Sequence, residues 1–226
     1  MLYSKEAVRD NIRNRDGKRV FYLGKGDQLT SDARDYLTRE RIAILPASEA
    51  KPERYRLLNG GYMEQKPEHM THLNGEVLVP KTHPRILLRG AVDTLEGELL
   101  LCSAAAAGHI RKQLEEALAY TRNLLRCEVL GEPVKETLLG GMDEKNLRER
   151  SHRPQEFYGQ PHFMPNPEDG VLLLQVNRAR CAARAAELKA VAAFPDSRED
   201  LLRAFNRLSS FLYLIMIQLK SNKYNA

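Results

Sequence analysis

The sequence predicts a mainly α-helical protein, in which a small mixed α/β N-terminal extension precedes a five-helix, ferritin-like up-and-down bundle. Long segments with apolar residues at helical spacing fill the second part of the chain, and short connections separate them. Strand-like stretches are confined to the first part. Long helices joined by short connections pack as a bundle, because each buries its apolar face against its neighbours. We therefore expect two parts, residues 1–75 and residues 76–226.

The first part is predicted to be a small mixed region followed by a linker. A short helix capped by Ser4 comes first, then the strand-like stretch KRVFYLG, a helix begun by Thr30 or Ser31, and the short strand IAILP. Residues 47–74 are rich in Pro, Gly and Glu, which is typical of a linker or a long loop.

The second part contains five segments with helical patterns. Pro84 is compatible with the first turn of the first segment. Ser197 is the expected cap of the last segment, with Asp200 in its first turn. The stretch QEFYGQPHFMPNPEDG is rich in Pro and aromatic residues, so we expect it to be irregular. The five predicted helices cover residues 83–107, 109–130, 142–152, 171–194 and 197–223.

The charge balance favours an anionic ligand without choosing one. The formal net charge is +5 and the sequence pI is about 9.1, which suits phosphates or nucleic acid. Basic runs such as RDNIRNRDGKR are interrupted by acids, so we interpret them as solvated surface and expect no nucleic-acid partner.

Cysteine usage and hydropathy indicate a reducing compartment. Cys102, Cys127 and Cys181 are odd in number and widely spaced, and no CxxC motif is present. We therefore expect neither a disulfide framework nor a structural zinc site. The longest apolar run, FLYLIMI, has seven residues, far fewer than a membrane span needs. The N-terminus shows no apolar signal region, so we expect a cytoplasmic protein without a membrane partner.

An arginine-rich stripe marks the fourth predicted helix. Arg180, Arg184 and Glu187 follow one another at helical spacing, and alanines surround them. Such residues often form surface ion pairs that contribute little to stability. A polyphosphate site is the other interpretation, because the arginine side chain is always charged and can donate to two phosphate oxygens at once. In that case, Glu187 would orient an arginine or hold a phosphate-bound Mg²⁺.

Two other predicted helices carry polar residues on one face. Arg89 and Asp93 are four residues apart on the first helix. Asn206 and Ser210 share a face at the head of the apolar run on the last helix. These residues could complete a polar site. Alternatively, Arg89 and Asp93 form a surface ion pair, and Asn206 belongs to the ordinary polar start of a buried helix.

At these residues the chain resembles a known family. The stretches PRILLRGAVD, RARCAARAAE and FNRLSSFLYLIMI are similar, in order and rough spacing, to motifs of the PduO-type ATP:corrinoid adenosyltransferases. The stretches LTSDARDYL, THLNGEVLVPKTHPR and RERSHRP are similar to segments of the ethanolamine-utilization branch of that family, EutT. The resemblance covers most of the chain, and the bundle carries its most specific part.

The resemblance implies a reaction and its participants. Cob(I)alamin attacks C5′ of ATP, which gives adenosylcobalamin for ethanolamine ammonia-lyase and releases triphosphate. By resemblance, Arg184 contacts the triphosphate, Arg180 pairs with Asp93 across a subunit interface, Glu187 supports the arginines or Mg²⁺, and Asn206 holds the nucleotide. ATP lies between subunits of a homo-oligomer, for which a trimer is favoured over a dimer.

The family also places apolar side chains against the corrinoid to exclude its lower axial ligand. The matching loop here is PHFMP, so the resemblance nominates Phe163 and Met164 for cobalamin binding. Phe157 and Tyr158 are substitutes in the same segment. These aromatic residues could equally well pin a loop onto the bundle. A cobalamin reductase, ethanolamine ammonia-lyase and a bacterial microcompartment are the associations that the resemblance suggests.

The sequence departs from the family pattern at several positions. The enteric branch carries a metal motif of His and Cys residues before the bundle, but the matching stretch LLNGGYMEQKPEHMTHL contains no cysteine. We therefore expect no metal site of that kind. Glu96 replaces an Asn of the family, and Ser210 replaces an acid.

The N-terminal phosphate loop of the family is matched only loosely, by YLGKGDQLT. In this match, Lys25 would contact ATP phosphates. A tight turn between a strand and a helix explains the stretch as well.

Three rival functions remain open from the sequence. The bundle could bind a corrinoid as a carrier or sensor without transferase activity, although such a protein needs no triphosphate clamp. Residues 1–75 could be a docking module for a microcompartment shell or for the lyase. The basic pI could serve nucleic-acid binding, which predicts a steep dependence on salt.

Overall fold

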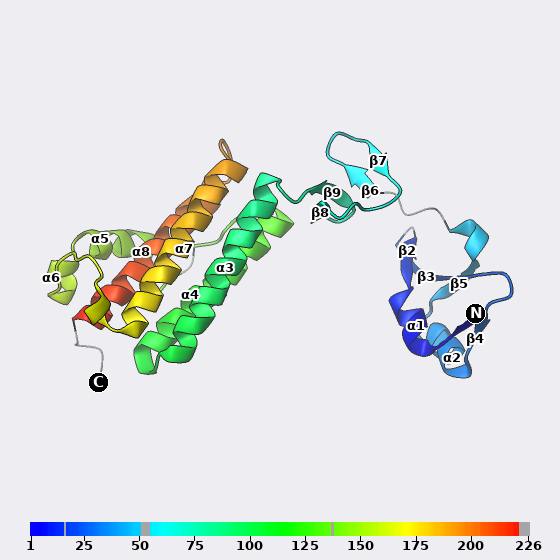
Figure 1. Ribbon diagram of the computed structural model, residues 1–226, viewed down its shortest axis with the longest axis horizontal. Coiled ribbons are helices and arrows are strands. Elements are labelled where there is room, and N and C mark those ends of the chain that lie inside the picture. The colour runs from blue at the N-terminus through cyan, green and yellow to red at the C-terminus, as the bar shows by residue number, and fades with distance from the viewer. Residues whose placement is uncertain (16, 51–54, 137, 222–226) are drawn as a thin grey trace. The chain divides into compact units, whose positions relative to one another are not determined.

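A computed structural model describes residues 1–15, 17–50, 55–136 and 138–221. The chain divides into two units, Met1–Arg54 and Tyr55–Ala226, whose elements are labelled in Figure 1. It is mainly helical, with a helical bundle in the C-terminal part and small mixed sheets in the N-terminal part, as the sequence predicts. Within the described residues, no helix combines the length and the apolar character that a membrane crossing requires.

The N-terminal unit contains two small sheets and two short helices. Strand β3 (Lys18–Leu23) pairs antiparallel with β2 (Arg13–Arg15) and parallel with β5 (Ala43–Pro46). Strand β1 (Leu2–Tyr3) lies parallel to β4 (Gln28–Leu29), and η1 (Ala47–Glu49) follows β5. The helices α1 (Lys5–Asp10) and α2 (Ser31–Arg39) begin at the predicted caps Ser4 and Thr30. The side-chain oxygens of Ser4 and Thr30 accept hydrogen bonds from backbone N–H groups that would otherwise lack partners. The apolar core cluster of this unit consists of Val8, Phe21, Leu29, Ala33, Leu37 and Ile42.

The prediction of a linker over residues 47–74 is wrong for much of that range. Three strands form there, β6 (Tyr55–Leu57), β7 (Tyr62–Met63) and β8 (Met70–Asn74). They join β9 (Val77–Pro80) in a four-stranded sheet of the order β7-β6-β9-β8. Val77, Leu78 and Val79 are buried, so β9 provides the apolar centre that the turn-rich composition conceals. Residues 51–54 lie outside the described residues. The sheet belongs to the C-terminal unit, and the boundary at residues 75–76 stays a prediction.

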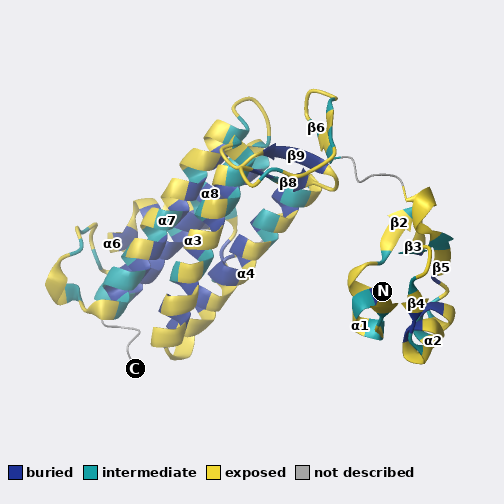
Figure 2. Ribbon diagram, turned by 45° about the vertical axis from the view of Figure 1, so that its right-hand side comes forward, coloured by how far each residue is buried: buried dark blue, intermediate teal, exposed yellow. Residues whose placement is uncertain are grey.

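The bundle contains four long helices and two shorter ones. The hairpin of α3 (Pro84–Ala105) and α4 (Gly108–Leu130) precedes α5 (Glu144–His152) and α6 (Pro154–Tyr158). After η2 (Pro167–Asp169), the chain forms α7 (Val171–Ala193) and α8 (Glu199–Lys220). Helix α7 packs against α3 and α8, while α8 also contacts α4 and α5. Figure 2 shows the buried residues on the facing sides of these helices and the exposed residues on their outer sides.

Small side chains allow α7 to approach its neighbours closely. Ala179, Ala183, Ala186 and Ala190 are all fully buried and recur every three or four residues. This spacing keeps them on one face of the helix. The arginines of α7 therefore leave the helix beside a tightly packed seam, which limits where their side chains can go.

The five predicted helices correspond to α3, α4, α5, α7 and α8, and two local predictions need correction. Ser197 is not the cap of α8, because the helix follows Arg198, whose φ of 55° is left-handed and whose side chain makes no cap bond. The segment predicted to be irregular contains α6, which begins at a proline in its first turn.

Candidate functional site

Two arginines of α7 line a pocket of about 320 Å³ against α8. Arg180 and Arg184 lie one turn apart on α7, so both side chains reach the same side of the helix. The end of α5 and the loop after α6 complete the wall. The remaining lining residues are Ser151, His152, His162, Ser209, Ser210 and Tyr213.

This arginine pocket has no carboxylate in its lining. Among the described residues, Arg184 makes no hydrogen bond or ion pair, and Arg180 donates to the neutral amide oxygen of Asn177 at 3.0 Å. Arg178, on the same helix, instead pairs with Glu98 at 2.6 Å. Two guanidinium groups without a counter-ion, accompanied by imidazole and hydroxyl groups, form a site suited to an anion.

A chain of polar contacts joins α7, α8 and α5 beside the pocket. Asn206 Nδ2 donates to Glu187 Oε1 at 2.9 Å, and Arg207 Nη1 donates to Asn206 Oδ1 at 3.1 Å. Arg207 Nε also donates to Glu144 Oε1 at 3.1 Å. The structure thus brings Glu187 and Asn206, which sequence reasoning assigned to one site, into direct contact. It also explains the position of Arg207, whose charge is balanced by Glu144.

The loop that contains Phe163 and Met164 lies against α8. The Phe163 ring stacks on Tyr213 with centroids 6.4 Å apart, and the Lys220 amine lies 5.6 Å from the Phe163 centroid. Lys220 also forms an ion pair with Asp169. Phe163 therefore packs against the bundle core, while Met164 is 87% exposed. Only Phe163 of the two predicted cobalamin contacts is held in place by packing.

Of the predicted site residues, Asp93 on α3 is not in the lining of this pocket, and Lys25 belongs to the other unit of the chain. Asp93 is exposed on α3 and makes no ion pair among the described residues. Arg89, which the spacing places beside Asp93, donates instead to Glu128 of α4 at 2.7 Å. Lys25 lies in the N-terminal unit, in the turn between β3 and β4, where Asp27 accepts a hydrogen bond from the Met1 amine at 2.6 Å.

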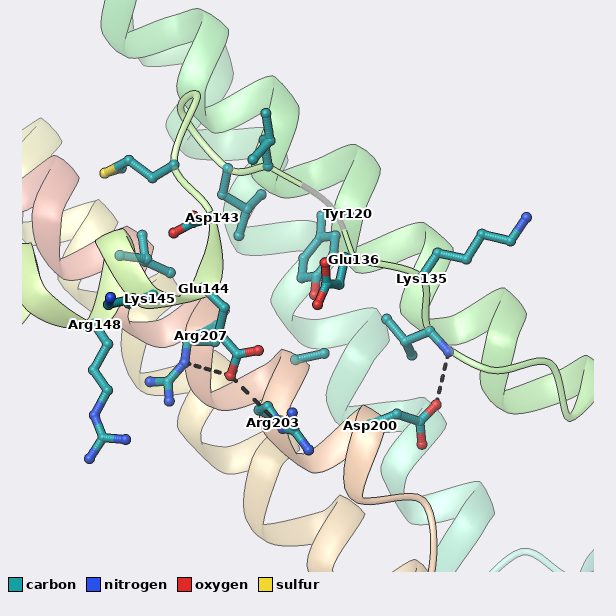
Figure 3. Close-up of a pocket in the computed structure, with 16 residues that line it drawn as sticks. Tyr120, Lys135, Glu136, Asp143, Glu144, Lys145, Arg148, Asp200, Arg203 and Arg207 are labelled. Atoms are coloured by element: carbon teal, nitrogen blue, oxygen red, sulfur yellow. Dashed lines mark hydrogen bonds and ion pairs between the residues drawn. The ribbon is translucent and has the colours of Figure 1, made fainter.

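A second, larger pocket of about 910 Å³ lies between α4, the segment before α5, and the start of α8. Figure 3 shows Glu144 between Arg203 and Arg207, with Tyr120 and Asp200 on the surrounding walls. Apolar residues such as Leu139 and Met142 contribute to its lining. Because its lining includes carboxylates and Glu144 already pairs with Arg203 and Arg207, this pocket is less specific for an anion than the arginine pocket.

Sequence reasoning missed the groups that other segments bring to the arginine pocket. His162 and Tyr213 are 51 residues apart, yet His162 Nδ1 lies 2.9 Å from the Tyr213 hydroxyl. His152 belongs to the segment RERSHRP, so the family resemblance could have drawn attention to it. No periodic pattern connects His162 with Tyr213, because the loop between α6 and α7 has no regular spacing.

The described residues contain no group of three or more His, Cys, Asp and Glu side chains placed to hold a metal ion. Glu187 is the carboxylate nearest in sequence to the two arginines, and it accepts one hydrogen bond from Asn206. A Mg²⁺ ion that arrives with a polyphosphate needs one or two carboxylates from the protein, since phosphate and water oxygens complete its six ligands. Glu187 fits that limited role.

Comparisons with known proteins match most of the chain to one family. The profile of the cobalamin adenosyltransferase family matches residues 61–219. Corrinoid adenosyltransferase EutT of Escherichia coli K12 is 29% identical over 158 residues, and EutT of Salmonella typhimurium is 28% identical. Each alignment covers 68% of this chain and 59% of the relative, so the match spans less than two thirds of those proteins.

The solved structures include a similar fold. A variant of a PduO-type ATP:corrinoid adenosyltransferase from Lactobacillus reuteri, complexed with cobalamin and ATP, matches with a TM-score of 0.54 and 19% identity. The match covers 70% of this chain and 90% of that chain. The matched family segment includes the bundle helices and the arginine pocket, and on this basis the chain belongs to the cobalamin adenosyltransferase family.

Proposed function

We propose that the protein transfers the 5′-deoxyadenosyl group of ATP to cob(I)alamin and thereby forms adenosylcobalamin and triphosphate. The observation that carries the proposal is the arginine pocket, in which Arg180 and Arg184 face no carboxylate. The family match supplies the reaction class. Ethanolamine ammonia-lyase is the proposed consumer of the product, because the sequence resembles the ethanolamine-utilization branch of the family.

The reaction needs alignment and charge neutralisation from the protein. The cobalt of the substrate forms the bond to C5′, and the electron pair of the broken C5′–O bond leaves with the triphosphate. No protein base has to act at the carbon, because the corrinoid supplies the nucleophile. What remains is to hold C5′ in line with cobalt and to stabilise the charge on the leaving triphosphate.

In our proposal, Arg184 contacts the triphosphate directly. Its guanidinium lines the pocket and has no partner among the described residues, so all its donors are available to phosphate oxygens. Asn206 and Glu187 hold the nucleotide side of the site, and their mutual hydrogen bond of 2.9 Å fixes both side chains. A Mg²⁺ ion bound to the triphosphate would use Glu187 and phosphate oxygens.

Phe163 is the proposed apolar contact with the corrinoid. Phe163 stacks on Tyr213, and the residue before it in the loop, His162, lines the arginine pocket. A corrinoid bound at this loop would therefore lie next to the anion site. Met164, with 87% of its surface exposed, could then be covered by the same ligand.

We also propose a homo-oligomer, with a trimer favoured over a dimer. Asp93 lies on an exposed face of α3 together with Gly97 and Leu100, and Leu100 is 46% exposed. A Cβ added at Gly97 would meet nothing within 4 Å in the chain, which leaves room for another helix. In that assembly, Asp93 of one subunit would pair with Arg180 of the next and fix it for ATP. The Lys25 turn is a further proposed phosphate contact.

The test is an anaerobic assay with purified protein, ATP, Mg²⁺ and chemically reduced cob(I)alamin. We expect the cob(I)alamin absorbance band to decay as adenosylcobalamin and triphosphate form in equal amounts. Cobalamin binding without either product would contradict the proposal and would favour a carrier or sensor. Arg178→Ala is the matched control, because Arg178 lies on the same helix but pairs with Glu98.

A further inference from the structure

His162 has two hydrogen-bond partners, and together they fix the position of its proton. Its Nε2 lies 3.3 Å from the backbone oxygen of His152, and its Nδ1 lies 2.9 Å from the Tyr213 hydroxyl. A carbonyl oxygen can only accept, so Nε2 must carry hydrogen. In the neutral ring, Nδ1 is then an acceptor, and the Tyr213 O–H donates to it.

Tyr213 therefore has its single proton committed to His162. Burial raises the pKa of Tyr213, although the backbone N–H of Phe163 and the Arg180 charge act in the opposite direction. The hydroxyl consequently stays protonated around neutral pH and acts as a donor. The Tyr213 ring stacks on the His162 ring with centroids 5.7 Å apart and an interplanar angle of 13°, which holds the two rings nearly parallel.

Protonation of His162 would reverse the hydrogen bond to Tyr213. The imidazolium donates from both nitrogens, so Nδ1–H would donate to the Tyr213 oxygen. The Tyr213 O–H would then be free to turn toward another acceptor. Both residues line the arginine pocket, so an anion in that pocket would be the acceptor.

The charges around His162 make this change depend on the ligand. Arg180 and Arg184 of α7 share the pocket, and the His152 imidazole of α5 is the other titratable group in the lining. Beyond Phe163, Lys220 of α8 is paired with Asp169. A bound polyanion would add negative charge to this pocket, and negative charge nearby favours the imidazolium form.

We propose that His162 is a proton-linked positioning residue, which takes up a proton when a polyphosphate chain enters the arginine pocket and so releases the Tyr213 hydroxyl to contact it. This inference rests on the proposed function, because that function puts triphosphate in the pocket. The proton comes from solvent and returns to solvent when triphosphate leaves. Imidazole is suited to the role because its charge changes near neutral pH.

The experiment measures protons taken up on binding. Inorganic triphosphate is titrated into the full-length protein by calorimetry, at about pH 6 and about pH 8, in paired buffers with different heats of protonation. The wild type is compared with His162→Gln, since a glutamine amide can accept from Tyr213 and donate to the His152 carbonyl as neutral imidazole does. His152→Gln tests the rival titrating group, and His69→Gln is a control in the turn before β8.

Averaged between the two pH values, we expect the wild type to take up about half a proton more per triphosphate than His162→Gln. The affinity ratio of wild type to His162→Gln should be about tenfold larger at the lower pH. Triphosphate itself gains negative charge as pH rises, so its own titration would change affinity in the opposite direction. His152→Gln and His69→Gln should behave as the wild type does.

Wild-type proton uptake in His162→Gln, or its loss in His152→Gln alone, would overturn the inference. If His162→Gln does not fold, Tyr213→Phe gives the answer, because it keeps the ring and removes the hydroxyl. It should lose the gain in affinity at the lower pH, and a wild-type pH profile in Tyr213→Phe would also overturn the inference. Failure of the wild type to bind triphosphate would overturn the assignment of the arginine pocket as well. If the wild type and His162→Gln bind triphosphate alike at both pH values, only the proposed role of His162 is overturned.

Discussion

Two arginine pairs in the bundle have the same spacing but different surroundings. Arg85 and Arg89 on α3 both donate to the side chain of Glu128, which is 2% exposed. Arg180 and Arg184 on α7 are also four residues apart, but they line a pocket without a carboxylate. Helical spacing therefore predicts which arginines share a face, and the counter-ion decides whether the pair holds helices together or is available to a ligand.

The difference arises from the neighbouring helix. Opposite the first pair, α4 presents a glutamate within its buried stripe, one turn after the buried Leu124. Opposite the second pair, α8 presents Ser209, Ser210 and Tyr213. Both serine hydroxyls donate to the Asn206 backbone oxygen. Since a hydroxyl carries no charge, neither can neutralise a guanidinium. The uncompensated charge on α7 is what a triphosphate would balance.

Removing the shared carboxylate should have the largest effect. Glu128→Ala leaves Arg85 and Arg89 partly buried without a counter-ion, and breaking a buried pair in this way costs about 3–5 kcal/mol. Urea unfolding followed by circular dichroism measures the change. Glu96→Ala is the matched control on the same helix pair, since Glu96 binds the half-exposed Arg122, and the expected cost is about 0–1 kcal/mol. Equal losses in both variants would show that burial of Glu128 is unimportant.

Arg184→Ala, in contrast to Glu128→Ala, should reduce catalysis and leave the stability of the protein unchanged. Loss of a charge-assisted contact to the triphosphate should raise the barrier by about 1.5–3 kcal/mol or more. The measurement is kcat/KM for ATP in the anaerobic assay, together with the urea midpoint. Arg178→Ala should keep near wild-type turnover because Arg178 is balanced by Glu98. Wild-type turnover in Arg184→Ala would remove that residue from the site.

Asn206→Asp should weaken nucleotide binding by a smaller amount. The Asn206 amide donates to Glu187 at 2.9 Å, and an aspartate there would place two carboxylates together beside an anion site. We expect ATP affinity to fall by about 1–2 kcal/mol, as measured by calorimetry. Asn206→Ala should cost less, because it removes the hydrogen bond without adding charge. The reverse order of the two variants would argue against a nucleotide at this position.

The smallest expected effect concerns His83, next to the first arginine pair. His83 caps α3, and its Nδ1 accepts the Arg85 backbone N–H at 3.2 Å. Burial, with help from Arg85 and Arg89, lowers the pKa of His83, although Glu128 acts in the opposite direction. Because the pKa of His83 is lowered in the folded state, the contribution of this cap to the unfolding free energy is fully present above the unfolded pKa of about 6.5. It is lost as pH falls through the folded pKa.

We therefore expect the unfolding free energy to fall from about pH 7 to about pH 5 by up to about 1 kcal/mol more in the wild type than in His83→Asn. Asparagine is a good cap that does not titrate. Urea unfolding at both pH values checks this, and parallel pH profiles for the two proteins would show that the His83 cap does not depend on its charge.

The sequence predicted the helices well because their apolar residues follow a period that the bundle satisfies. It failed at β6–β9, where strands of two to five residues carry too few positions for a pattern to emerge from the Pro and Gly around them. It also failed at Arg198, whose side chain makes tertiary contacts with the backbone oxygens of Cys127 and Glu132 that no local pattern indicates.

The site was predictable only where it lies on one helix. The family resemblance and the spacing together nominated Arg180, Arg184 and Glu187. The two arginines line one pocket, and Asn206 contacts Glu187. The pairing of His162 with Tyr213 depends on how the loop after α6 folds back on α8, which no local pattern encodes. Glu128 could have been found, because it continues the buried stripe of Thr121 and Leu124 on α4.

The most direct test of the central claim is calorimetric titration of inorganic triphosphate into the wild type and into Arg184→Ala at constant pH and salt. The account predicts that the wild type binds triphosphate and that Arg184→Ala binds it at least about tenfold more weakly, with an unchanged unfolding midpoint. Equal affinities in the two proteins would contradict the claim that the carboxylate-free arginine pair on α7 is the anion site.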